Sequence, residues 1–94
     1  MDTRRVTKAP RVLLQDLDGE AVLLNLANGH YYGLDATSFR MYDVLISASS
    51  VQAAYQLLLQ EYDVEPDRLR QDFEKFVEDL VRNGLVLREH EQPE

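Results

Sequence analysis

Two turn dipeptides, ten residues apart, constrain the first third of the chain. Asp18-Gly19 and Asn28-Gly29 frame the apolar residues 20–27. Asp-Gly and Asn-Gly adopt the positive φ angles that two-residue hairpins need. The pattern therefore predicts a three-stranded antiparallel meander over residues 11–17, 20–27 and 30–34. Since no later segment is as strand-like, the last strand should leave an open edge, which is an aggregation hazard or a docking site.

The rest of the chain has helical spacing of its apolar residues. Asp35 is a suitable N-cap for a first helix, and Ser49 with Gln52 fits a capping box for a second. Pro66 suits the first turn of a third helix, which Gly84 would end in a left-handed conformation. The predicted helices are residues 36–46, 50–61 and 66 to about 83. Residues 85–87 then form a short final strand or an extended tail. The predicted fold class is α+β, with a three-stranded antiparallel sheet followed by three helices.

Length and composition indicate one small domain. The chain has 94 residues, no cysteine and 45% hydrophobic residues, which suits a globular core and excludes disulfides. We expect a flexible N-terminal arm over residues 1–10, a domain over 11–88 and a flexible tail over 89–94. No apolar run reaches the ~20 residues that span a bilayer. We expect a cytoplasmic protein with no membrane contact.

Pairing the last two strands through a two-residue turn predicts their register. Leu24 would lie opposite Gly33, and Leu23 opposite Leu34. One face of the sheet would then carry Tyr31, and the other Tyr32. Both faces are rich in apolar residues, and a layer of three helices covers only one of them. The other face must meet a partner, a second copy or the N-terminal arm, unless the register is shifted or the sheet curls over its own core.

Catalysis, metal binding and cofactor binding have little support. The only histidines are His30, beside a turn, and His90, in the C-terminal tail. Nucleophilic catalysis needs a nucleophile beside a base, and the chain offers no cysteine and only these two histidines. No cluster of His, Cys, Asp or Glu has the spacing of a zinc site. The four glycines fall at turns, strand ends or a cap rather than in a phosphate-binding loop. We expect a protein that is not an enzyme and has no metal or cofactor.

The charge distribution argues against nucleic-acid binding. Residues 48–94 contain five basic and eleven acidic side chains, and residues 65–83, which include the third predicted helix, have a net charge of −2. A recognition helix normally offers Arg and Lys to phosphates. A DNA-binding winged helix stays an alternative, as does a subunit of an obligate assembly that covers the free edge. Oligomeric state is open.

Peptide binding fits the residues better. An extended peptide adds to a free strand edge through main-chain hydrogen bonds, while pockets select its side chains. The edge is residues 30–34, and the third helix is the natural second wall. Plain core is the other role for the helix's apolar stripe, and we favour it for Phe73 and Leu80. The candidate peptide-binding residues are His30, Tyr31, Tyr32, Gly33, Leu34, Arg68, Leu69, Asp72, Phe73, Lys75, Phe76 and Asp79.

Residues 23–37 (LLNLANGHYYGLDAT), 61–64 (EYDV) and the segment 69–86 ending in NGLV resemble the PqqD-like family. The likeness covers about residues 11–88. It implies a fold similar to a winged helix-turn-helix and a role as a precursor-peptide recognition element in pathways that modify ribosomally made peptides. Such elements bind the leader segment of the precursor as an added strand between the third strand and the third helix.

Within this family, the chain looks most like the free-standing leader-binding half of split lasso-peptide B systems. That likeness implies a non-catalytic adaptor with a leader peptide as its ligand. It also implies a separate cysteine protease, the leader peptidase, and possibly a cyclase as protein partners. The nearest alternative is PqqD itself, which presents its peptide to a radical enzyme.

Overall fold

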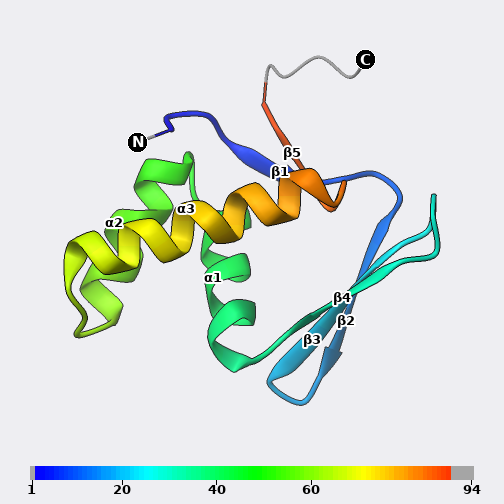
Figure 1. Ribbon diagram of the computed structural model, residues 1–94, viewed down its shortest axis with the longest axis horizontal. Coiled ribbons are helices and arrows are strands. Elements are labelled where there is room, and N and C mark those ends of the chain that lie inside the picture. The colour runs from blue at the N-terminus through cyan, green and yellow to red at the C-terminus, as the bar shows by residue number, and fades with distance from the viewer. Residues whose placement is uncertain (1, 90–94) are drawn as a thin grey trace.

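A computed structural model describes residues 2–89 of the chain (Figure 1). Met1 and residues 90–94, which include His90 and most of the predicted C-terminal tail, lie outside the described residues. The elements in chain order are β1 (Val6–Lys8), β2 (Val12–Leu17), β3 (Glu20–Asn25), β4 (Tyr31–Leu34), α1 (Ala36–Ser47), α2 (Val51–Glu61), α3 (Pro66–Arg82) and β5 (Val86–Arg88).

Strands β2, β3 and β4 form the predicted antiparallel meander, in that order. Leu17 lies opposite Glu20, so Asp18 and Gly19 make a two-residue turn between β2 and β3. Their φ angles of 61° and 94° are both positive, as this turn requires. The meander leaves β4 paired on one side only, at the edge of its sheet.

The second hairpin differs from the predicted register by two residues. Leu24 lies opposite Tyr31 rather than Gly33. The loop is longer because Asn25 closes it: its N–H donates to the His30 carbonyl at 2.8 Å, and its own carbonyl accepts from Gly29 N–H at 2.8 Å. Gly29 still has a positive φ of 74°. A shift of two keeps every side chain on its predicted face, because side chains alternate with a period of two.

The first residues of the chain belong to the fold, which corrects the expected arm over residues 1–10. Strand β1 pairs antiparallel with β5 in a second, two-stranded sheet, and Val6 is fully buried. Nearer the N-terminus, the carbonyls of Asp2 and Arg4 accept hydrogen bonds from the N–H groups of Gln52 and Val51. These N–H groups open α2 and have no partner within the helix, so the N-terminal segment supplies their acceptors.

The helices begin and end close to the predicted residues. Asp35 caps α1 by accepting from Ser38 N–H at 2.8 Å. The cap of α2 is Ser50, whose hydroxyl accepts from Ala53 N–H at 2.9 Å, so the predicted capping box at Ser49 is wrong by one residue. Helix α3 begins with Pro66, and Gly84 follows it with a φ of 70°.

Helix α1 packs against β3 and β4 on one face of the meander, α2 packs on α1, and α3 packs on α2 (Figure 1). Ala21, Leu23 and Leu34 on that face are buried together with the main apolar side chains of the helices. The opposite face, which we call the outer face, contains several large apolar side chains that are about half exposed or more. These are Leu13, Leu17, Leu26 and Tyr31. The second face that the sequence predicted to be apolar is therefore open in the monomer, and the N-terminal segment does not cover it.

None of the helices within residues 2–89 combines the length and apolar character needed to cross a bilayer.

Candidate functional site

The free edge of β4 presents backbone groups of two residues. In an antiparallel ladder, residues alternate between pairs that exchange hydrogen bonds and pairs that do not. The bond from Asn25 N–H to the His30 carbonyl fixes the phase of this alternation. Tyr32 and Leu34 therefore bond toward β3, while Tyr31 and Gly33 direct their N–H and C=O groups to the free edge. An added strand finds its main-chain partners at these two residues.

The two adjacent tyrosines point to opposite faces of the sheet. Tyr31 shares the outer face with Leu24 and is 76% exposed. Tyr32 shares the other face with Leu23 and packs half-buried against the core. An added strand would thus meet Tyr31 on the outer face and Tyr32 on the side of the helices.

A pocket of about 190 Å³ lies between α1 and α3, and the loop that joins α2 to α3 also lines it. Its surface is mainly apolar, and α1 follows β4 directly, so the pocket lies beyond the carboxyl end of the edge strand. The lining residues are Thr37, Met41, Tyr62, Val64, Arg68, Leu69 and Asp72. Arg68 and Asp72 form an ion pair at 3.9 Å on its rim and are largely exposed.

The structure distributes the predicted helix residues between pocket and core. Arg68, Leu69 and Asp72 line the pocket. Phe73 is completely buried and Phe76 nearly so, which gives Phe73 the core role that the sequence favoured. Helical spacing puts Lys75 and Asp79 on the same flank of α3 as Asp72, where they pair with each other at 3.4 Å.

Sequence reasoning missed four of the pocket's residues: Thr37, Met41, Tyr62 and Val64. Met41 and Thr37 are one helical turn apart on α1 and so share a face. That spacing was readable in the sequence, but their proximity to α3 depends on how the helices pack. Val64 is 47% exposed in a loop, and no periodicity marks such a residue.

Electrostatic features near the edge strand are modest. The backbone N–H and hydroxyl of Ser38 hold the pKa of Asp35 below its ordinary value, so this carboxylate is ionised at neutral pH. Within residues 2–89, no group of three or more His, Cys, Asp or Glu side chains is placed to hold a metal ion.

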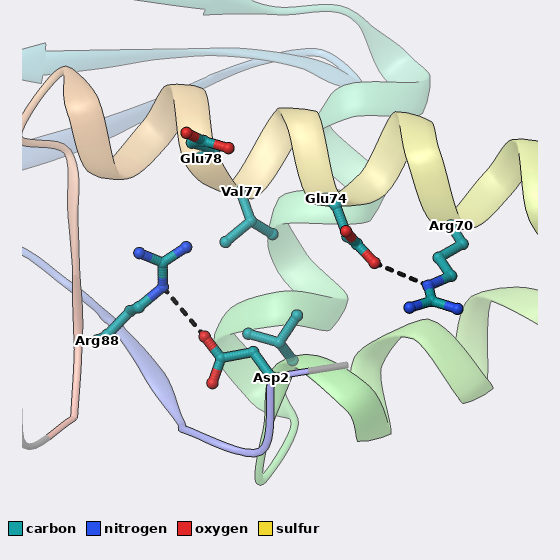
Figure 2. A pocket seen from close by; sticks show the side chains of 7 residues that line it. Asp2, Arg70, Glu74, Val77, Glu78 and Arg88 are labelled. Atoms are coloured by element: carbon teal, nitrogen blue, oxygen red, sulfur yellow. Dashed lines mark hydrogen bonds and ion pairs between the residues drawn. The ribbon is translucent and has the colours of Figure 1, made fainter.

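A second hollow, of about 210 Å³, lies on the other flank of α3 (Figure 2). Four of its charged side chains form two ion pairs, Arg88 with Asp2 at 3.2 Å and Arg70 with Glu74 at 2.8 Å. Glu78, which also lines the hollow, pairs with Arg82 outside it at 3.3 Å. The Arg4 side chain, with a smaller effect from Arg88, lowers the pKa of Asp2. This hollow joins the N-terminal segment to β5 and α3, and we assign it a structural role.

Comparison with known families agrees with the fold. The family model described as coenzyme PQQ synthesis protein D (PqqD) matches residues 20–86, which include the meander's last two strands and all three helices. The chain belongs to the PqqD family. PqqD domains are generally non-catalytic binding modules. The match confirms both the resemblance and the α+β, winged helix-turn-helix-like fold. No curated protein matches significantly.

Two solved structures resemble this PqqD-family chain closely. One is TbiB1 in complex with the TbiA(β) leader peptide, with a TM-score of 0.78 and 26% identity over 93% of this chain and 99% of that one. The other is lasso peptide synthetase B1 complexed with the leader peptide, with a TM-score of 0.78 and 28% identity over 88% of this chain and 98% of that one.

Proposed function

We propose that this protein is a non-catalytic adaptor that binds the leader segment of a ribosomally made precursor peptide by β-strand addition. The observation that supports it most is the free edge of β4, where Tyr31 and Gly33 offer unpaired main-chain groups, with the pocket between α1 and α3 beyond the carboxyl end of this strand. An extended peptide gains affinity from the main chain and specificity from such a pocket.

The ligand enters this proposal through the two similar structures. Both are complexes with leader peptides, and both cover nearly the full length of this chain. One of the two is a lasso peptide synthetase B1, and we propose a lasso-peptide context for this protein too. The twelve sequence-predicted residues remain the proposed contact region, with the buried Phe73 and Leu34 acting as support beneath it rather than as surface.

In this proposal, the adaptor acts by raising effective concentration. It holds the leader while the tethered core peptide reaches a processing enzyme, which needs no chemistry from the adaptor itself. The proposed enzymes are a separate cysteine protease that removes the leader and a cyclase. Presentation of a peptide to a radical enzyme, as for PqqD, is the second candidate, favoured by the family match over residues 20–86.

The experiment is a fluorescence-anisotropy titration with labelled leader segments of the precursor peptides encoded beside this gene. A charge in the apolar pocket should weaken binding strongly, since burying an unpaired charge is costly. We expect Met41→Glu to raise the Kd at least about tenfold, or about 1.4 kcal/mol. Leu57→Glu is the matched control, because Leu57 is 50% exposed on α2 and does not line the pocket.

Two other outcomes would identify other functions. Duplex DNA that binds where leaders do not, with affinity falling steeply as salt rises, would indicate a winged-helix DNA reader. A stable dimer or larger oligomer in sedimentation without any peptide would indicate an obligate assembly, in which a second protein covers the open sheet.

A further inference from the structure

A shallow hollow of about 240 Å³ lies at the end of the meander where β2 turns into β3, and it extends across to Gly33 and Leu34 of β4. Leu17, Val22 and Gly33 line it on the outer face, Ala21 and Leu34 belong to the opposite face, and its surface is mainly apolar. Val22 lies directly opposite Gly33 in the ladder. The hollow shares no lining residue with the pocket between α1 and α3, so the two are distinct.

The missing side chain of Gly33 helps to form this hollow. A Cβ atom built on Gly33 would meet nothing within 4 Å, and the φ angle lies outside the left-handed region. No turn or close packing in the described structure therefore requires a glycine here. Glycine weakens a strand interior, and it often marks a place where a ligand approaches closely.

Strand addition at β4 brings a peptide side chain to this position. Gly33 directs its N–H and C=O to the free edge, so a docked residue lies opposite it. In both parallel and antiparallel pairing, directly opposite residues point to the same face. The side chain of that docked residue therefore projects onto the outer face, over Gly33 and toward Val22, with Tyr31 beside it.

We propose that this hollow is a specificity subsite for one large apolar side chain, best an aromatic one, at the leader position opposite Gly33. The inference rests on the proposed function, because it needs a strand docked on β4. An aromatic ring covers the exposed backbone of Gly33 and reaches the apolar surface of Val22, which glycine leaves open. The hollow is thus filled by the ligand rather than by the protein.

Charge narrows the choice of side chain further. Two carboxylates, Glu20 and Asp35, border the hollow. Asp35 also caps α1 and stays ionised. An Asp or Glu at this leader position would be repelled, while an apolar residue is tolerated.

The test fills the hollow from the protein side. We expect Gly33→Val to leave the melting temperature unchanged or raised, because valine suits a strand and meets no neighbour. The same variant should raise the Kd for a leader that binds the wild type at least about tenfold, and Gly33→Ala should give a smaller increase. Gln15→Val is the matched control. It adds the same side chain to the outer face, opposite Val22 on the far side from β4, and should leave the Kd within about twofold.

An alanine scan of the same leader identifies the interacting position. Replacing one large apolar leader residue by Ala should weaken the binding of the leader to the wild type. The same replacement should hardly change its binding to Gly33→Val. Replacing that residue by Glu should weaken binding more than Ala does. Equal affinity of Gly33→Val and wild type, or additive effects at every leader position, would overturn the subsite while leaving the proposed function intact. Failure of every leader to bind the wild type would overturn both.

Discussion

The side-chain amide of Asn25 donates a hydrogen bond to the main-chain carbonyl of Asn83 at 3.4 Å, across 58 positions of sequence. Asn25 is 7% exposed at the end of β3, and Asn83 caps the end of α3. The side-chain oxygen Oδ1 of Asn25 also accepts a hydrogen bond from Ala27 N–H at 2.9 Å, within the loop that leads to β4. One buried amide therefore connects the two walls of the proposed groove, the edge hairpin and the third helix.

Asn25→Ala should destabilise the protein by about 1–3 kcal/mol, because it removes two hydrogen bonds of a buried side chain, from Ala27 N–H and to the Asn83 carbonyl, each worth about 0.5–1.5 kcal/mol. Urea unfolding followed by circular dichroism measures the change. Asn28→Ala is the control, since Asn28 accepts one bond from His30 N–H in an exposed loop. If both variants lose the same free energy of unfolding, the buried amide has no special role.

Removal of residues 1–5 should lower stability by about 1–2 kcal/mol, similar to the loss of a strong N-cap. The deletion removes the carbonyls of Asp2 and Arg4, which accept from the first N–H groups of α2. It also removes the hydrogen bond from Glu89 N–H to the Arg5 carbonyl and the ion pair of Asp2 with Arg88, but keeps residues 6–8 of β1 paired with β5. Thermal unfolding of the deleted and full-length chains measures the difference. An unchanged melting temperature would mean that solvent replaces these bonds fully.

Replacing the two tyrosines of β4 should affect the melting temperature differently. Tyr32→Ala should weaken leader binding by about 2 kcal/mol and also lower the melting temperature, because Tyr32 packs against the core. Tyr31→Ala should leave the melting temperature unchanged, because Tyr31 is 76% exposed. Binding is measured well below the melting temperature of both variants. Unchanged affinity in both single variants would contradict a groove at β4.

Stability should fall at alkaline pH through one buried phenol. Burial raises the pKa of Tyr42 above its ordinary value of 10.0. A raised pKa means that the folded state binds the Tyr42 proton more tightly than the unfolded state does. The contribution of this proton to folding stability is therefore complete below pH 10 and is lost as the pH rises toward the pKa of the folded state. The melting temperature of the wild type should therefore fall more steeply above pH 10 than that of Tyr42→Phe. Parallel curves would contradict this assignment.

The sequence predicted the local elements well, because each has a chemical signal within a few residues. Asp18-Gly19 specified its turn, and Asp35, Pro66 and Gly84 marked helix ends. The register of the second hairpin failed because Asn25, rather than the Asn28-Gly29 turn alone, closes the loop. These bonds use the main chain of a residue outside the turn dipeptide, so a dipeptide pattern does not predict them.

Long-range pairing explains the other differences. Strand β1 exists because Val6 is buried beside β5, which lies some 80 residues later in the chain. Strands β1 and β5 have only three residues each, and such short segments give too weak a pattern to predict a strand. The pocket between α1 and α3 has the same origin: Leu69 was predicted from the stripe of α3, while Met41 and Tyr62 approach it only through helix packing.

Strand addition at β4 is tested most directly by a scan of leader peptides that are N-methylated at one residue at a time. Methylation removes a single main-chain N–H while keeping the side chain. Because only Tyr31 and Gly33 of β4 offer main-chain groups at the free edge, affinity should fall at two leader positions that lie two residues apart and stay nearly unchanged at the position between them. A loss that follows side-chain identity, without this period of two, would contradict docking as an added strand.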